Sequence, residues 1–290
     1  MELLALSDLW QYGQYVLAAI VPVAFVLLII AGIVASVGDS IHRGKLRQER
    51  PEQEQKIPAI AQQNGWDYVP RDDRWLSVID VFEKGQDPQS VETAKKNQLK
   101  SKGASGRALY STRFEVNPTS VVEHVITTNV QGRQCVVFQH RANEGQPRKT
   151  KQDTWETRWE EDPDKANYGV TVAMQLPKPT PFVCIARRWR GAVSSFVGDD
   201  TTLEHHGFNR KYFVFMEHMR FGYDIVNQST ISWILETQPP KGVFLTVADG
   251  WCFISRQDIL RAEEVQQHVD ELSQFVSLIP DHVWSVDYSN

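Results

Sequence analysis

The residues best suited to binding a small ligand lie between positions 187 and 210. Arg187, Arg188 and Arg190 surround Trp189. Guanidinium groups grip carboxylates in a bidentate manner, and an indole ring adds a cation–π contact. A polar group of two histidines, an asparagine and an arginine follows within twenty residues. If these side chains converge, we expect them to line a pocket built from Arg187, Arg190, His205, Asn209 and Arg210.

A structural interpretation of the same residues is simpler. An arginine cluster is more often a solvated strand end than an anion site, and an asparagine at a strand entry commonly satisfies backbone groups. In the sequence Phe208-Asn209-Arg210 the asparagine would then bond to the backbone beside an exposed arginine. The sequence favours this interpretation over a ligand pocket.

The motifs of the common enzyme classes are absent from the sequence. It contains no glycine-rich dinucleotide or P-loop motif, no zinc-protease helix motif, no serine nucleophile elbow and no Cys-x-x-Cys pair. Neighbouring residues of a strand point to opposite faces, so His205 and His206 cannot easily share one metal ion. The acidic run at 160–164 lies in polar sequence that offers no burial to separate carboxylate pKa values. We therefore expect no catalytic residue, no metal and no cofactor.

The three cysteines, Cys135, Cys184 and Cys252, each lie within an apolar, strand-like run. Their number is odd and their spacing fits no metal site. Buried free thiols in a reducing compartment are the simplest interpretation.

A long uncharged stretch near the N-terminus is the strongest signal in the sequence. No charged residue occurs from Leu9 to Gly38, and the apolar run Tyr15–Val37 is long enough to cross the roughly 30 Å of a bilayer core as a helix. A cleaved signal peptide would need a basic start and a shorter apolar core. Basic residues stay on the cytoplasmic side, so the N-terminus should face outward and the rest of the chain the cytoplasm. The basic residues that carry this inference are Arg43, Lys45, Arg47 and Arg50.

The predicted membrane helix and its basic flank each suggest a partner. Small residues let a second helix approach closely, and we expect an interface with other integral membrane subunits at Ala31, Gly32, Ala35 and Ser36. The flank of basic residues is expected to contact anionic membrane lipid. The alternatives are that small residues are common in any membrane helix and that the basic run is only a topology signal.

Charge argues against a nucleic-acid partner. The chain has 290 residues, 31 of them Lys or Arg and 36 Asp or Glu, giving a net charge of −5. Three of the acidic residues precede the basic flank, so the part beyond the predicted membrane helix has a net charge of about −2. Such a domain lacks the basic face needed to neutralise phosphates.

Hydrophobic periodicity and turn signals organise the rest of the chain. Helices are expected at about 58–64, ended by Gly65, and at 262–278. Asp72 or Asp73 should cap a short helix, and Asn227 or Ser229 should separate helices at 221–226 and 229–235. Strands are expected at 66–69, 108–116, 121–130, 134–140, 168–176, 182–188, 208–215 and 243–254, the last of these folding into a hairpin.

Turns and loops complete this organisation. Gln131-Gly132 and Asp249-Gly250 are expected to form hairpin turns. Residues 143–153 are expected to be a polar, basic loop. Because strands and helices do not alternate regularly, the fold class is α+β with a mostly antiparallel sheet and flanking helices. The expected organisation is an outer tail at 1–14, a transmembrane helix at 15–37, a basic juxtamembrane connector at 38–56 and a cytoplasmic domain at 57–290 with a polar insertion at 85–106.

A resemblance to known proteins rests on short stretches scattered through the chain. They are Gly65-Trp66-Asp67-Tyr68, Gly132-Arg133, Phe208-Asn209-Arg210, Ile231 to Leu235 and Gly250-Trp251. In these the sequence resembles uncharacterised actinobacterial single-pass membrane proteins with a cytoplasmic α+β domain. Its layout is also similar to that of accessory subunits of actinobacterial cytochrome bcc–oxidase supercomplexes. Neither resemblance supplies catalytic residues.

Two functions follow as expectations. The first is a non-enzymatic accessory or scaffold subunit of a larger membrane complex, such as a respiratory supercomplex. The second is a membrane-tethered cytoplasmic sensor or enzyme whose pocket is assembled from residues distant in sequence.

Overall fold

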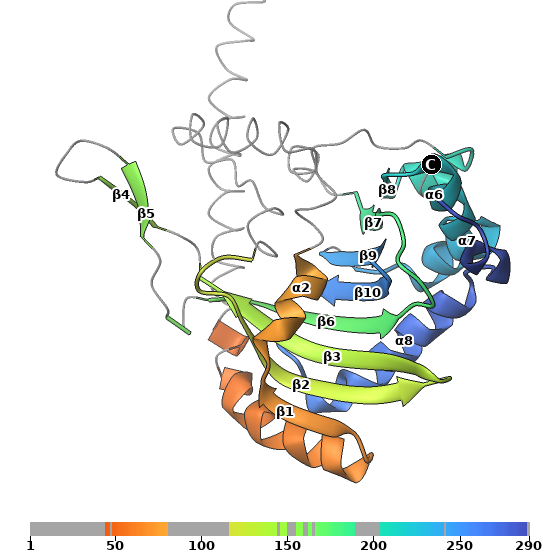
Figure 1. Ribbon diagram of the computed structural model, residues 1–290. Coiled ribbons are helices and arrows are strands. Elements are labelled where there is room, and N and C mark those ends of the chain that lie inside the picture. Colours follow the sequence, from red (N-terminus) through yellow and green to blue (C-terminus); the bar gives the residue numbers. More distant parts are fainter. Residues whose placement is uncertain are drawn as a thin grey trace, which may run out of the picture. The chain divides into compact units, whose positions relative to one another are not determined.

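The computed structural model describes residues 44–46, 48–80, 116–143, 146–149, 155–158, 162–163, 166–188, 203–240 and 242–288. The chain divides into two compact units, 1–51 and 52–290, and the second holds the folded domain shown in Figure 1. The predicted membrane helix at 15–37, its small-residue strip and the insertion at 85–106 lie outside the described ranges. Within those ranges no helix combines the length and apolar character needed to cross a membrane.

The domain is built on one eight-stranded antiparallel sheet. Its strands lie in the order β1-β2-β3-β6-β10-β9-β7-β8, and every neighbouring pair is antiparallel. The predicted α+β class is therefore confirmed. The strands are β1 (Asp67–Arg71), β2 (Val121–Val130), β3 (Arg133–Ala142), β6 (Asn167–Gln175), β7 (Val183–Arg187), β8 (Tyr212–Met216), β9 (Val243–Ala248) and β10 (Trp251–Arg256). A separate two-stranded sheet contains β4 (Gln146–Lys149) and β5 (Trp155–Arg158).

Both predicted hairpin turns are present. Gln131 and Gly132 have φ angles of 53° and 79° between β2 and β3, and Asp249 and Gly250 have 49° and 82° between β9 and β10. Positive φ at both central residues is what a type I′ turn requires, and asparagine-like residues followed by glycine tolerate it best.

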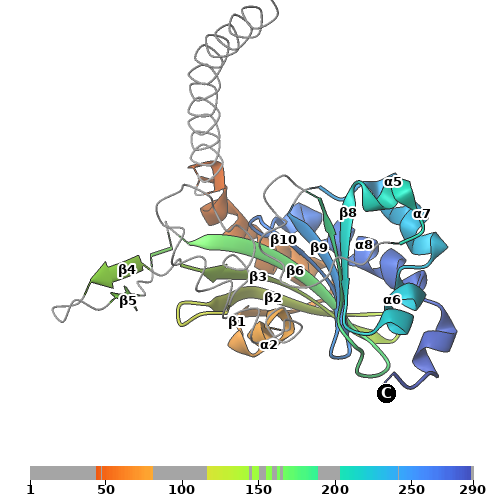
Figure 2. The same ribbon diagram turned by 90° about the horizontal axis from the view of Figure 1, so that it is seen from above.

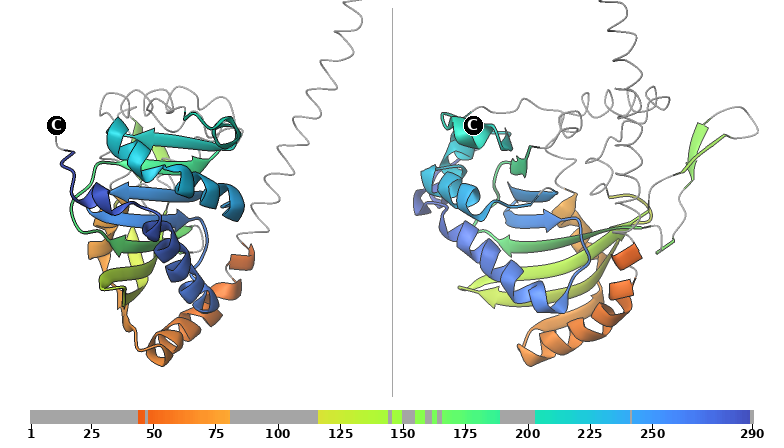
Figure 3. Two further views of the ribbon diagram at one scale, coloured as in Figure 1. Left: turned by 90° about the vertical axis from the view of Figure 1, so that its right-hand side faces the viewer. Right: turned by 180° about the vertical axis from the view of Figure 1, so that it is seen from behind.

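Helices cover both faces of the sheet. Figures 2 and 3 show α8 and the helix containing residues 52–63 on one face and α2 on the other. The predicted caps are confirmed at Asp72, which accepts a hydrogen bond from the Arg74 amide, and at Asn227, which accepts from Ser229 and Thr230. The elements are η1 (Asp73–Trp75), α2 (Leu76–Ile79), α5 (His206–Asn209), α6 (Met219–Ile225), α7 (Gln228–Thr237), η3 (Ala262–Glu264), α8 (Val265–Ser277) and η4 (Asp281–Trp284).

Strand alternation divides the core into two layers. On the α8 face, Val172 of β6 belongs to the same buried cluster as Leu272 and Phe275 of α8. On the opposite face, Phe138 and Phe253 are fully buried, and the Trp75 ring stacks 6.4 Å from Phe138.

Two predicted segments differ from the structure. Residues 208–215 were expected to form one strand, but the first part is α5 and only Tyr212–Met216 is strand β8. The His205 side chain accepts a hydrogen bond from the Phe208 amide at 3.0 Å, and this cap starts a helical turn where the apolar pattern alone suggests a strand. The expected polar loop at 143–153 contains strand β4.

The N-terminal helix of the domain also begins earlier than predicted. Residues 48–63 are helical, whereas the sequence predicted a helix only from about 58, after a connector broken by Pro51. Ile57 is buried in the core, and the Gln53 side-chain oxygen accepts a hydrogen bond from the Ala262 amide at 2.9 Å. Burial against η3 extends the helix beyond what local propensity indicates. Gly65 follows with a φ of 66°, as predicted for the residue after the helix end.

Candidate functional site

The structure gathers most of the predicted pocket residues at one end of strands β7 and β8. His205, Asn209 and Arg210 belong to α5 and its two ends, which lead directly into β8. Arg187 ends β7 in register with Tyr212 of β8. Arg190 lies outside the described residues.

The polar atoms of these side chains bond to the backbone. The Asn209 side chain accepts a hydrogen bond from the Leu203 amide at 3.2 Å and donates to the Leu203 carbonyl. His205 caps α5, and Arg187 donates to the Pro239 carbonyl at 3.3 Å. Arg210 is exposed at the end of the helix. The hydrogen bonds of His205, Asn209 and Arg187 to backbone groups agree with the structural interpretation of these residues and not with an open ligand pocket.

Arg188, which belongs to the predicted arginine cluster but not to the predicted pocket, connects these elements. Its guanidinium lies 3.9 Å from the centre of the Phe213 ring, and its Nε donates to the carbonyls of Asn209 and Tyr212. Its own amide donates to the Lys211 carbonyl at 2.6 Å. Arg188 therefore holds α5 against β8. The basic cluster was visible in the sequence, but the bonds of each arginine depend on the fold.

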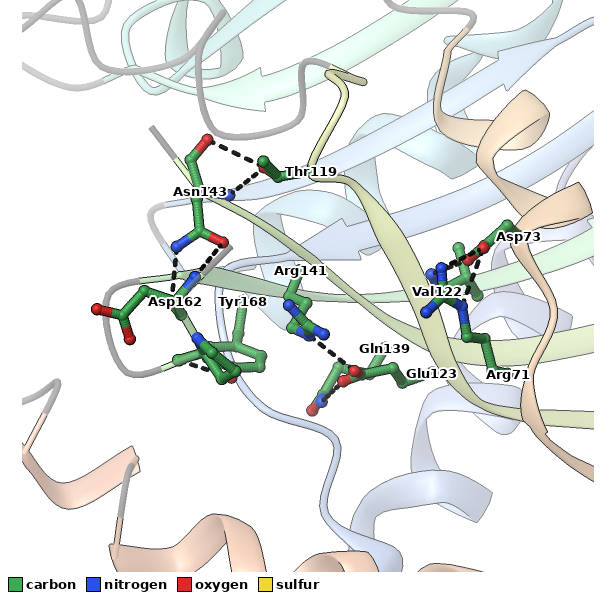
Figure 4. Close-up of polar contacts among 11 residues, drawn as sticks. Arg71, Asp73, Thr119, Val122, Glu123, Gln139, Arg141, Asn143, Asp162 and Tyr168 are labelled. Atoms are coloured by element: carbon green, nitrogen blue, oxygen red, sulfur yellow. Dashed lines mark hydrogen bonds and ion pairs between the residues drawn. The ribbon is translucent and has the colours of Figure 1, made fainter. Parts of the chain in front are cut away.

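A second polar group occupies the α8 face where β2 and β3 lie side by side (Figure 4). Arg141 Nε donates to Glu123 at 2.7 Å, and Gln139 donates to the other oxygen of the same carboxylate at 3.5 Å. The side chains of Arg141 and Glu123 are only 12% and 24% exposed. Gln139 also accepts a hydrogen bond from the Leu260 amide at 2.9 Å, which fixes the chain before α8 on the sheet.

The network continues through charged residues around the start of α8. Arg256 pairs with Glu271 at 2.7 Å, and Arg261 pairs with Asp258 at 3.0 Å and with Glu264 at 3.6 Å. Each of these arginines thus has at least one carboxylate partner within the group. We call the set formed by Glu123, Gln139, Arg141, Arg256, Asp258, Arg261, Glu264, His268 and Glu271 the polar layer.

His268 is the buried titratable group of the polar layer. Its side chain is only 3% exposed and its Nε2 lies 3.7 Å from Glu264. Within the described part of the chain, its Nδ1 has no hydrogen-bond partner. Burial, followed by the charge of Arg256 and more weakly of Arg261, lowers the pKa of His268 to about 3, while Asp258 opposes the shift. The imidazole is therefore neutral at physiological pH. The sequence contains one indication that His268 is buried: it lies within the apolar stripe of the helix, between Val265 and Val269.

A third polar group fastens the C-terminal segment to α6. The Tyr288 hydroxyl donates to Asp224 at 2.8 Å, and His282 pairs with the other Asp224 oxygen at 3.3 Å. Burial, and then the Asp224 carboxylate, raise the pKa of Tyr288 to about 12, so its phenol stays protonated. The Lys178 amine donates to the Val286 carbonyl and lies 5.2 Å from the centre of the Tyr288 ring.

Metal binding has no support from the described ranges. They contain no group of three or more histidine, cysteine, aspartate or glutamate side chains placed to hold a metal ion. The predicted lipid-contact residue Lys45 lies in a short helical stretch, and Arg50 is helical as well. Arg43 and Arg47 lie outside the described residues.

The reactivity of the three cysteine thiols tests whether the core is packed as described. All are fully buried, and burial raises the pKa of Cys135 and of Cys184 to about 12 and that of Cys252 further. A thiolate is the reactive form, so we expect no reaction with Ellman's reagent at about pH 8 in the folded protein. Three thiols per chain should react in denaturant. Rapid reaction of a native thiol would contradict the described core.

Comparisons with known proteins give one distant structural likeness. The fold is similar to that in the crystal structure of the mycobacterial trehalose monomycolate transport factor A, TtfA, with a TM-score of 0.43 and 10% sequence identity. The match covers 78% of this chain and 93% of that chain. No family model matches the sequence, and no curated protein matches it at a significant level. The likeness is distant and assigns no family.

Proposed function

We propose that this protein is a non-enzymatic, single-pass accessory subunit of a larger complex in the cytoplasmic membrane. The N-terminus would lie outside and the α+β domain in the cytoplasm. The observation that carries the proposal is the uncharged stretch from Leu9 to Gly38, followed directly by a basic flank. The sequence resemblance suggests a respiratory bcc–oxidase supercomplex as the complex concerned.

The described domain supports a role in binding rather than catalysis. Side chains that commonly perform chemistry have structural tasks here: His205 and His218 cap helices, and Asn209 bonds to the backbone. The thiols are buried and protonated, and the charges of the polar layer are paired with one another. A domain organised in this way presents a fixed surface to a partner.

Purification of the full chain in mild detergent tests this proposal. We expect other membrane subunits to co-purify in a fixed ratio. Replacing Gly32 and Ala35 with isoleucine should preserve membrane insertion, because hydrophobicity rises, but should block close helix approach and release the protein from its complex. The matched control replaces Ile29 and Val34 with leucine and should leave the complex intact.

One outcome would contradict the proposal, and another would move the site of attachment away from the membrane helix. Purification as an isolated protein that carries a tightly bound metabolite would favour a sensor or an enzyme. Equal retention of both double variants would show that the membrane helix is not the site of attachment.

A further inference from the structure

Asn64-Gly65 and Asp249-Gly250 are the residue pairs of this sequence that most readily form a cyclic imide. In such a pair the glycine nitrogen attacks the side-chain carbonyl carbon of the preceding residue, because glycine has no Cβ atom to hinder the approach. No other asparagine or aspartate in the sequence is followed by glycine. The two pairs carry the same chemical risk, and the fold treats them differently.

Asn64 and Gly65 are exposed in the turn that follows the helix ending at residue 63. A Cβ atom placed on Gly65 would meet no described atom within 4 Å. The Gly65 amide donates to the Gln62 carbonyl at 3.2 Å, and the Asn64 side chain donates to the Ile60 carbonyl at 2.8 Å. These two bonds keep the reacting groups apart, but both lie in the last turn of a helix, where bonds open most easily.

Asp249 and Gly250 form the turn of the β9–β10 hairpin, and the structure holds this turn from several sides. The Gly250 amide donates to the Thr180 hydroxyl at 3.4 Å, and the Gly250 carbonyl accepts from the Leu176 amide at 2.8 Å. Gly250 is buried, and a Cβ atom placed on it would lie 3.3 Å from the Lys178 carbonyl oxygen. Imide formation here requires the hairpin itself to open.

We propose that Asn64 is a site of deamidation in the folded protein. The Gly65 nitrogen forms a bond to Cγ of Asn64, the bond from Cγ to Nδ2 breaks, and Nδ2 leaves as ammonia with the proton of the Gly65 amide. Water then opens the imide. Addition of water at the side-chain carbonyl gives aspartate, and addition at the main-chain carbonyl gives isoaspartate. The chain and water are the only reactants.

The fold sets the rate of this reaction through the opening of the helix end. Breaking two exposed hydrogen bonds should slow deamidation of Asn64 about 30-fold relative to the unfolded chain. Imide formation at Asp249 should be slowed by a factor at least about tenfold larger, because opening the hairpin breaks many more contacts. Comparing each site with its own unfolded rate removes the difference in intrinsic reactivity between asparagine and aspartate.

The products would weaken the junction between this helix and β1. Both replace the donor that bonds to the Ile60 carbonyl with a carboxylate, and they add a negative charge at the C-terminal end of a helix, where the helix dipole disfavours it. Isoaspartate also adds one atom to the main chain, three residues before Asp67 pairs with Thr127. Deamidation would therefore act as a slow, one-way loosening of β1.

Mass spectrometry of the full chain in detergent tests the site. The folded protein and the same protein in guanidinium chloride are incubated at mildly alkaline pH in water enriched in heavy oxygen, then digested. Fragmentation by electron transfer distinguishes aspartate from isoaspartate. We expect the labelled products at Asn64 in the folded protein, with the smaller slowing factor of the two sites. Asn64→Gln retains an amide donor and should abolish the label there.

Hydrogen exchange tests the consequence. Asn64→Asp reproduces one of the two products and should speed exchange of the β1 amides several-fold, while the amides of β9 should be unchanged.

The contrary results are specific to each step. A slowing factor at Asn64 as large as that at Asp249 would overturn the proposed site, and so would heavy oxygen appearing first at another asparagine. The same total label in Asn64→Gln as in the natural chain would also exclude it. Unchanged exchange of β1 in Asn64→Asp would overturn the loosening of β1 by the aspartate product.

Discussion

Substituting Gly169 with alanine should destabilise the domain by about 2 to 3 kcal/mol. Gly169 of β6 lies opposite His140 of β3 in the ladder, and a Cβ atom added at Gly169 would lie 2.2 Å from the His140 ring. His140 is 2% exposed, so its ring has little room to move. Thermal or urea unfolding of the two proteins measures the loss.

A double-mutant cycle shows whether the imidazole is the cause. Replacing His140 with alanine removes the clashing ring, so Gly169→Ala should cost much less in that background than in the natural chain. An equal cost in both backgrounds would mean that the glycine is required for another reason.

Lowering the pH should destabilise the domain through His268. The pKa of His268 is about 3 in the folded state, compared with about 6.5 in an unfolded chain. The neutral imidazole is the form that the fold favours, so its contribution is complete above about pH 6.5. It is lost as the pH falls toward 3, because the unfolded chain takes up the proton first. Integrated over this window, the loss approaches about 4 kcal/mol.

Urea unfolding at about pH 7.5 and 4.5 isolates this contribution. Over that interval the natural chain should lose about 2 to 3 kcal/mol to His268 in addition to the effects of other groups. His268→Leu should reduce the pH dependence by that amount, since leucine occupies the apolar stripe without a titrating group. The exposed His206 provides a control, and His206→Leu should leave the pH dependence unchanged. The same pH dependence in His268→Leu as in the natural chain would exclude the assigned role.

The sequence predicts those elements whose signals are local. The turns at Gln131-Gly132 and Asp249-Gly250 follow from a glycine that adopts positive φ readily, and the cap at Asn227 follows from a side chain that satisfies free amides. The apolar stripe of α8 likewise needs only helical periodicity. Each of these elements is present in the structure.

Elements that depend on distant contacts were predicted less well. The helix that includes residues 52–63 starts early because Gln53 bonds to Ala262, more than two hundred residues away. The bond of Gln139 to Leu260 joins residues 121 positions apart, and so the polar layer could not be assembled from spacing alone. Of the predicted pocket residues, Arg187, His205, Asn209 and Arg210 lie at one end of β7 and β8. The backbone groups to which their polar atoms bond become visible only in the fold.

The position of β10 in the sheet has a consequence for the order of folding. β10 lies between β6 and β9, so β1, β2, β3 and β6 have no strand pairing with β7, β8 and β9 until β10 is added. Residues 251–256 must therefore leave the ribosome before the sheet can become continuous, long after the predicted membrane helix has emerged. The partly synthesised chain would expose an apolar edge on each half, and such edges favour aggregation. Early capture at the membrane would keep these nascent chains apart.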